Sequence, residues 1–251
     1  MSGHSKWATI KHKKGAADQK RAKVFAKLIR QVEVAAREGG GDPAMNPALR
    51  TMLQKARDSS VPIDTIERAI KRGSGVGADS VEYLNIMYEA YGPNGVALMI
   101  ECLTDNKNRA AADVRLALSR SGGTLADPGS VAYQFARKGV IVVPAENTNE
   151  DAVLEAVLDF AVDNVEDRGE QIVVTTDPSE MVAVRLALQN AGIDYESADV
   201  EFVASMDVQV DAETARKVIK MIDSLEDSDE VQNVYSNFDM SAEVMAELEN
   251  D

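Results

Sequence analysis

Positively charged side chains are concentrated at the start of the chain, where their type suits contact with phosphate groups. The segment from Met1 to Arg37 holds ten Lys and Arg residues against Asp18 and Glu33, a net charge of +8. Such cations bind the backbone of nucleic acids without distinguishing bases, although a charged surface that serves only solubility is the alternative. The expected phosphate contacts are Lys6, Lys11, Lys13, Lys14, Lys20, Arg21, Lys23, Lys27 and Arg30.

The rest of the chain carries the opposite charge. The 251 residues include 27 basic and 42 acidic side chains, a net charge of −15, but division after Ala78 separates +9 from −24. This asymmetry predicts that the basic segment meets a polyanion, which we expect to be DNA or ribosomal RNA. The acidic segment is expected to be repelled by phosphates or to receive a basic ribosomal or transcription protein.

Two kinds of side chain in the basic segment add further contact chemistry. His4 and His12 stand among polar and basic residues, so a phosphate contact or a positioning role is favoured over general base catalysis. Trp7 could stack on a base or anchor the segment on the helices that follow. We favour anchoring, because aromatic residues make up only 5% of the chain and single-strand binders use several rings.

Residues for catalysis or metal binding are scarce. With two histidines and one cysteine, the chain lacks the residues for a disulfide framework or a Cys/His zinc site, and Cys102 falls in an apolar stretch that favours a buried, inert thiol. The numerous carboxylates are scattered, so we predict no enzymatic activity, no cofactor and no metal. The single cysteine and the lack of a long apolar run predict a cytoplasmic protein without a membrane partner.

Helices must position the basic residues. Over residues 17–37, apolar residues recur at helical spacing within an arc of roughly 140°, and most of the cations occupy a separate arc. A second helix is predicted after Asn46 and Pro47. A third is predicted with Pro62 in its first turn and Gly73 as the residue just beyond its end. Residues 1–78 should therefore form a basic three-helix bundle. Its other cations, which would extend the binding surface, are Arg50, Lys55, Arg57, Arg68, Lys71 and Arg72.

Glycine-rich segments follow the first and third of these helices. One covers Gly39 to Gly41, and the other covers residues 73–77 and leads to the acidic segment. Neither follows a predicted strand or ends in the Gly-Lys-Ser/Thr sequence of a nucleotide-binding loop. We therefore interpret both as hinges rather than phosphate loops.

The acidic segment has the pattern of an α+β protein. Alternating residues predict strands over 84–91 and 96–103 that form a hairpin, followed by a helix that ends at Gly122. Residues 136–204 then show a new series of elements in the order βαββαβ, which is the order of a ferredoxin-like domain. A strand at 206–210, a helix at 215–225 and a strand at 231–238 follow.

These elements predict the overall architecture. We expect an N-terminal three-helix bundle followed by two ferredoxin-like α/β domains, one of them discontinuous. The discontinuous domain would combine residues 79–135 with 205–240, and residues 136–204 would be inserted into it. The acidic residues 241–251 should form a frayed helix on the surface.

Several runs of residues resemble the YebC/PmpR family. They are Gly3-His4-Ser5-Lys6-Trp7-Ala8, Ile10-Lys11-His12-Lys13-Lys14, Gly39-Gly40-Gly41-Asp42-Pro43, Glu89-Ala90-Tyr91-Gly92-Pro93, Glu101-Cys102-Leu103-Thr104-Asp105-Asn106-Lys107-Asn108-Arg109 and Gly129-Ser130-Val131-Ala132-Tyr133. The resemblance implies a helical N-terminal domain and two α/β domains, one interrupted. Bacterial members are described as cytoplasmic DNA-binding transcriptional regulators. A mitochondrial relative activates translation, and other bacterial members are linked to ribosomes.

The resemblance also draws attention to Asn106, Asn108 and Arg109 as a second candidate patch, with helix capping as an equal alternative. No helix-turn-helix spacing is evident, so direct base reading lacks support. We expect a DNA-binding transcriptional regulator. A ribosome-associated translation factor that binds rRNA and assists elongation is the nearest alternative, and an acidic protein-binding adaptor is the third.

Overall fold

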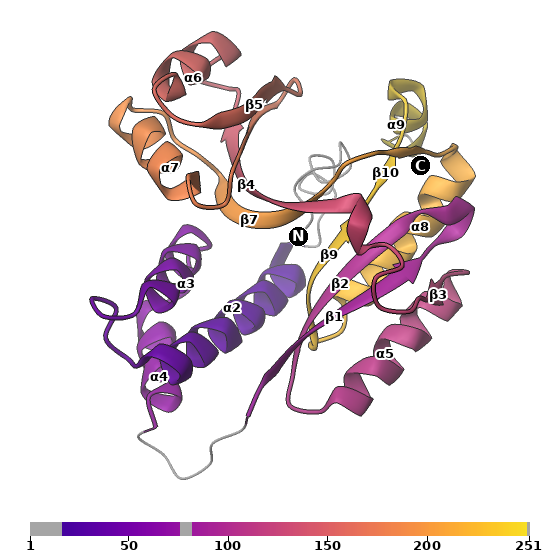
Figure 1. The fold of residues 1–251 in the computed structure, drawn as a ribbon, viewed down its shortest axis with the longest axis horizontal. Coiled ribbons are helices and arrows are strands. Elements are labelled where there is room, and N and C mark those ends of the chain that lie inside the picture. Colours follow the sequence, from indigo (N-terminus) through magenta and orange to yellow (C-terminus); the bar gives the residue numbers. More distant parts are fainter. Residues whose placement is uncertain (1–16, 76–81, 250–251) are drawn as a thin grey trace. The chain divides into compact units, whose positions relative to one another are not determined.

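The computed structural model describes residues 17–75 and 82–249, which form two compact units. Of the described residues, the helical unit comprises 17–75 and 82–85 together with 103–107. The sheet unit comprises residues 86–102 and the chain from residue 108 onward. The fold is α+β, with an N-terminal helical bundle followed by two α/β domains, one of them discontinuous (Figure 1).

Within residues 17–75, the helical unit contains three helices, as the sequence pattern predicts. They are α2 (Ala17–Gly39), α3 (Pro47–Asp58) and α4 (Ile63–Gly73). Both α3 and α4 pack against α2, and their apolar stripes meet in one core. Val32, Leu49 and Ala69 are completely buried there. The apolar face of α2 is therefore used for packing, which leaves its remaining faces for other contacts.

The turn between α2 and α3 is fixed by a buried asparagine. The Asn46 side chain accepts a hydrogen bond from Leu49 N (3.0 Å) and donates to Ala35 O (2.7 Å) and Gly40 O (2.8 Å). It thus caps the start of α3 and the end of α2 at once. A side chain at Gly39 would collide with Asn46, since its Cβ would lie 2.5 Å from the Asn46 amide nitrogen.

The end of α4 corrects one sequence prediction. Gly73 is the last residue of the helix rather than the residue beyond it, and the left-handed residue is Gly75 (φ 84°). Gly73 is needed for a different reason, because a Cβ at this position would lie 2.2 Å from Glu33 O on α2. The glycine therefore permits α4 to approach α2 closely.

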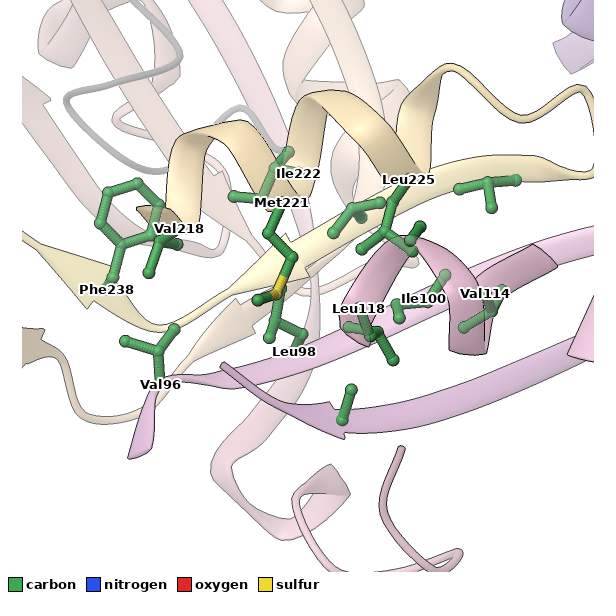
Figure 2. Packing of buried hydrophobic residues seen from close by; sticks show 14 of the residues in the cluster. Val96, Leu98, Ile100, Val114, Leu118, Val218, Met221, Ile222, Leu225 and Phe238 are labelled. Atoms are coloured by element: carbon green, nitrogen blue, oxygen red, sulfur yellow. The ribbon is translucent and has the colours of Figure 1, made fainter. Parts of the chain in front are cut away.

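One four-stranded sheet has the order β3-β1-β2-β9. Its strands are β1 (Leu84–Tyr91), β2 (Ala97–Thr104), β3 (Thr124–Leu125) and β9 (Val231–Ser236). Helices α5 (Lys107–Arg120) and α8 (Ala212–Glu226) contribute to one apolar core with this sheet. Figure 2 shows Leu118 of α5 and Met221 and Leu225 of α8 gathered over Leu98 and Ile100 of β2.

The fourth strand of this sheet differs from the predicted one. The segment predicted as a strand over 206–210 forms only β8 (Val208–Gln209), which pairs in parallel with β10 (Phe238–Asp239) outside the sheet. Strand β3 takes the fourth position instead, through the pairs Ala90–Leu125 and Tyr91–Thr124. A strand of two residues is too short to show a period of two, so the sequence pattern could not reveal it.

The second sheet confirms the predicted βαββαβ order. It contains β4 (Phe135–Pro144), β5 (Val162–Asp167), β6 (Gln171–Thr176) and β7 (Ser197–Ala204), with α6 (Glu150–Val157) and α7 (Met181–Asn190) on one face (Figure 1). The strand order β5-β6-β4-β7 is that of a ferredoxin-like domain. Helix α6 ends at Val157.

The C-terminal helix also differs from its prediction. Helix α9 (Ala242–Glu249) is not a frayed surface segment, because Leu248 is buried and Val244 and Met245 pack against the core of the first sheet. Arg216 of α8 forms an ion pair with Glu247 at 3.0 Å. The apolar spacing of residues 244, 245 and 248 places them on one helical face, which explains why the acidic segment docks.

Candidate nucleic-acid interface

The structure leaves part of the predicted interface undescribed. Lys6, Trp7, Lys11, His12, Lys13 and Lys14 lie outside the described residues, as does His4. Lys20 and Arg21 belong to α2, and their side chains also lie outside what is described. The predictions for these residues are therefore neither confirmed nor contradicted.

The described cations of α2 are partly buried. Lys23, Lys27 and Arg30 are all half-buried. The Arg30 guanidinium lies over the Tyr83 ring, 5.6 Å from its centroid, and its Nη1 donates to Leu103 O at 3.4 Å. Arg37, two turns further along the helix, lies 5.9 Å from the same ring. Tyr83 thus fixes the orientation of two α2 arginines through cation–π contact.

Apart from Lys107 at the start of α5, the exposed cations of the described helical unit lie on α3 and α4. Arg50 and Arg57 are seven residues apart on α3 and therefore share a face. On α4, the exposed cations are spaced three and four residues apart, which also places them on one face. They are Arg68, Lys71 and Arg72. Lys55 is half-buried.

Two of these arginines have partners inside the helical unit. Arg68 Nε donates to Asp64 O (3.0 Å) and its Nη2 donates to Thr65 Oγ1 (3.3 Å), so this side chain folds back along α4. Arg72 Nε donates to Glu33 Oε2 at 3.1 Å. Their guanidinium groups are therefore oriented by α4 itself and by α2.

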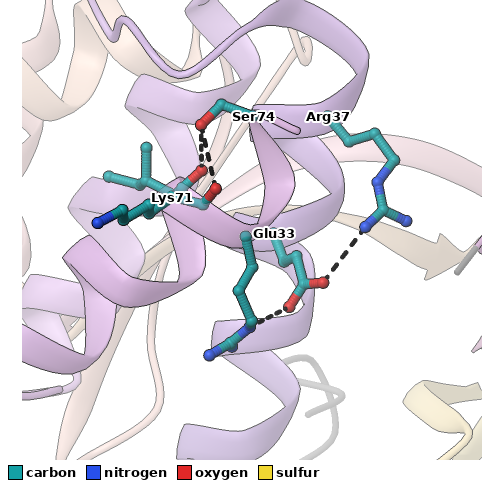
Figure 3. A network of polar contacts seen from close by, with 6 residues as sticks. Glu33, Arg37, Lys71 and Ser74 are labelled. Carbon is teal, nitrogen blue, oxygen red and sulfur yellow. Dashed lines mark hydrogen bonds and ion pairs between the residues drawn. The ribbon is translucent and has the colours of Figure 1, made fainter. Parts of the chain in front are cut away.

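Glu33 is a functional candidate that the sequence pattern missed. Its carboxylate lies between α2 and α4, bound by Arg37 Nη2 at 3.3 Å and by Arg72 Nε at 3.1 Å. Figure 3 shows the Glu33 and Arg37 side chains directed toward one another, while the Lys71 amino group points away. The spacing of four residues to Arg37 was visible in the sequence, but the contact with Arg72 spans 39 residues and leaves no local signal.

The second candidate patch, Asn106, Asn108 and Arg109, makes contacts that stabilise the fold. Asn106 N donates to Thr104 Oγ1 at 2.8 Å just before α5, and Asn108 is exposed in the first turn of the helix. Arg109 Nε donates to Glu230 Oε1 at 2.8 Å, and Arg109 Nη2 contacts the same oxygen. Because Glu230 is buried, this pair ties α5 to the segment that precedes β9.

Glu89 connects two of the sequence runs that carry the resemblance. Its buried carboxylate accepts hydrogen bonds from the backbone nitrogens of Gly129 (2.6 Å), Val131 (2.7 Å) and Ala132 (2.9 Å). Burial by itself raises the pKa of Glu89, but the three N–H donors outweigh burial and hold the pKa below its ordinary value. The loop that precedes β4 is thereby fixed to β1.

Other buried polar groups also serve packing. Tyr235 Oη donates to Glu101 Oε2 (3.3 Å), and Asn233 Nδ2 donates to the same oxygen (2.8 Å). Burial, reinforced by the Glu101 charge, raises the pKa of Tyr235. Cys102 is buried, as predicted. Within the described part of the chain, no group of three or more His, Cys, Asp or Glu residues could hold a metal ion.

The fold and the site define an α+β protein with a cationic helical domain and two α/β domains, one interrupted by the other. The chain belongs to the TACO1/YebC family. Residues 5–76 match the TACO1/YebC protein N-terminal domain, and residues 83–238 match the TACO1/YebC second and third domain. The resemblance seen in the sequence is confirmed.

Relatives match over the full length of the chain. A "probable transcriptional regulatory protein" of Leifsonia xyli subsp. xyli is 62% identical over 252 residues and covers 100% of both chains. A protein of the same description from Nocardia farcinica is 61% identical over 251 residues, again with 100% coverage of both. The crystal structure of a conserved hypothetical protein from Aquifex aeolicus has a TM-score of 0.85 and 41% identity, covering 94% of this chain and 98% of that chain.

A helix that crosses a lipid bilayer needs about 20 predominantly apolar residues. None of the helices within residues 17–75 and 82–249 combines the length and the apolar character that crossing a membrane requires.

Proposed function

We propose that this protein is a nucleic-acid-binding regulator of gene expression that acts on transcription through DNA. The separation of charge carries the proposal, since residues 1–78 hold +9 and the remaining residues hold −24. The names of the relatives from Leifsonia and Nocardia support a regulatory role. In this proposal the protein works in the cytoplasm by binding, without catalysing a reaction.

The binding surface combines the basic segment with the helical bundle. Lysines before α2 and on α2 would contact phosphates, and the exposed arginines of α3 and α4 would extend the surface. The acidic domains, which we place at residues 79–135 with 205–240 and at 136–204, would be repelled by phosphates and leave the basic bundle to bind. They remain free to receive a basic protein.

A second function, ribosome-associated translation through rRNA, is favoured by one observation. The exposed face of α4 carries Asp64 and Glu67 beside its cations. A helix that enters a DNA major groove would bring these carboxylates near phosphates, whereas contact with the outside of a folded RNA needs only the cations. Binding to rRNA is therefore the alternative that the experiment must distinguish from binding to DNA.

The experiment measures the affinity of the full-length protein for duplex DNA and for rRNA fragments as a function of salt. Neutralisation of about eight phosphates gives a log–log slope near −7 on duplex DNA. Substitution of Lys11, Lys13 and Lys14 by Ala should weaken binding nearly uniformly across sequences, because phosphates carry no base identity. A flat salt response, or unchanged affinity in this variant, would contradict the proposal.

A matched control removes three cations from the acidic part of the chain. Arg216, Lys217 and Lys220 are exposed on α8, and their replacement by Ala changes net charge by the same amount. This variant should bind like the wild type if the basic segment is the site. Crosslinking in cells, followed by sequencing of bound DNA and RNA, then decides the target: promoter fragments support transcription, and rRNA supports translation.

A further inference from the structure

A small pocket lies where α2 and α4 end within the helical unit. Its volume is about 250 Å³. The two glycine-rich segments of the sequence both contribute to it, although they are more than 30 residues apart. The lining residues are Ala36, Arg37, Gly40, Arg72, Gly73, Ser74 and Gly75. Segments interpreted from the sequence as separate hinges are thus brought together beside two arginines.

The two arginines are held in fixed orientations at the pocket. Glu33 binds Arg37 through Nη2 and Arg72 through Nε, so each guanidinium retains further N–H groups. Arg37 Nη1 is buried and has no hydrogen-bond partner within the described residues. An unpaired buried donor is costly, so Arg37 can bind a further acceptor without giving up an existing hydrogen bond. The Tyr83 ring, 5.9 Å from the Arg37 guanidinium carbon, further restricts this side chain.

The backbone leaves room for a ligand next to these donors. Gly40 (φ 86°) and Gly75 (φ 84°) adopt the left-handed conformation, and a Cβ at either position would meet no heavy atom of the described residues within 4 Å. Open space therefore adjoins both residues, and the lack of side chains permits close approach.

The charge of the pocket selects an anion. The C-terminal ends of two helices by themselves disfavour an anion, but several of their carbonyls are already bonded. Ser74 Oγ donates to Ile70 O (2.7 Å), and Asn46 Nδ2 donates to Ala35 O and Gly40 O. Arg37 and Arg72 against Glu33 leave one net positive charge at the pocket.

We propose that this pocket binds one phosphate of a nucleic-acid backbone, with Arg37 and Arg72 as the donors and Glu33 as the residue that positions them. Guanidinium groups suit this role because their planar forks bind phosphate oxygens in pairs. The inference rests on the proposed nucleic-acid binding and adds to it a specific phosphate subsite. The same chemistry would also accept free phosphate, so the experiment separates the two sources.

The first arm compares salt dependence of duplex binding between full-length variants. Replacement of Arg37 and Arg72 by Gln should reduce the magnitude of the log–log slope by about 1, the value for one phosphate contact. The control replaces Arg115 and Arg120, both exposed on α5, by Gln and removes the same charge. The control should leave the slope unchanged. Circular dichroism checks that both variants are folded.

The second arm uses variants that separate phosphate binding from a structural role. Glu33→Gln keeps the shape of the side chain but no longer holds the two guanidinium groups in one orientation, so duplex affinity should fall although the protein gains one positive charge. A variant with Lys in place of Arg37 and Arg72 keeps the charge but loses the paired N–H donors of the guanidinium groups. The log–log slope of its salt dependence should be retained while its duplex affinity falls. If the arginines only stabilise the helix ends, the positive charge gained in Glu33→Gln would leave duplex affinity unchanged or higher, and the inference would be wrong.

The third arm titrates inorganic phosphate at constant ionic strength and follows the amide NMR signals of Gly40, Ser74 and Gly75. Saturable shifts that disappear in the Arg37/Arg72 Gln variant support the pocket. Saturation by phosphate without a change in the duplex slope would overturn the nucleic-acid subsite, as would shifts that never saturate. Wild-type protein that binds neither DNA nor rRNA refutes the proposed function, whereas wild-type binding with an unchanged slope in the variant refutes this inference alone.

Discussion

Replacement of Glu89 by Gln tests how the loop before β4 is held. The carboxylate accepts three backbone N–H bonds of 2.6, 2.7 and 2.9 Å in a buried position. A charged acceptor contributes about 1 kcal/mol more per bond than a neutral one. The Gln amide also places an N–H₂ group where the protein presents donors. We therefore expect a loss of about 3 kcal/mol in the free energy of unfolding of the sheet unit.

The same carboxylate predicts a dependence on pH. Because the pKa of Glu89 is lowered in the folded protein, its stabilising contribution is fully present above the pKa of the unfolded chain. The contribution is lost as pH falls through the lower folded-state pKa. The difference between wild type and Glu89→Gln should therefore be large at neutral pH and shrink in acid.

The measurement combines urea unfolding with hydrogen exchange of the amides at residues 129, 131 and 132. These amides should exchange much faster in Glu89→Gln. The control, Glu213→Gln, removes an exposed ion pair with Lys217 on α8 and should leave the free energy of unfolding nearly unchanged. Equal exchange rates in wild type and Glu89→Gln would refute the assignment of the carboxylate as the clamp.

Two further substitutions test the helical unit by urea unfolding. Asn46→Ala removes three hydrogen bonds of a buried side chain and should cost about 2–4 kcal/mol, whereas Asn149→Ala, which removes one exposed cap on α6, should cost about 1 kcal/mol. Equal losses would contradict the double capping role. Gly73→Ala places a Cβ 2.2 Å from Glu33 O and should destabilise by about 2 kcal/mol despite the higher helix propensity of Ala. A stabilised Gly73→Ala variant would show that α2 and α4 can separate freely.

Periodicity was sufficient to predict the helices and most of the strands. The apolar stripes of α2, α3 and α4 and the βαββαβ order are local patterns, and the structure confirms them. Gly73 was assigned to the wrong role because a glycine beyond a helix and a glycine at a helix crossing look alike in sequence. The C-terminal segment was predicted to be an exposed helix because it is acidic. The helical spacing of Val244 and Leu248 was the better indicator, since both residues pack against the core.

The candidate site depended on contacts that sequence does not encode locally. The basic residues could be predicted from charge alone, but their partners could not. Tyr83 lies 53 positions from Arg30, and Glu33 lies 39 positions from Arg72. Helical spacing relates residues three or four apart and says nothing about pairs from different helices. The orientation of the cations therefore became visible only in the structure.

The position of Glu33 bears on what kind of binding the bundle supports. A surface selected only for attraction to polyanions gains from every added positive charge, and a carboxylate between two arginines reduces that attraction. Glu33 lowers the local charge by one but directs two guanidinium groups from different helices to one place. Pre-oriented donors favour a phosphate in one position over a phosphate passing at any angle. If the proposed subsite is correct, the bundle therefore sets the register of a nucleic-acid backbone as well as contributing affinity, which is what a regulator needs when its helices do not read bases.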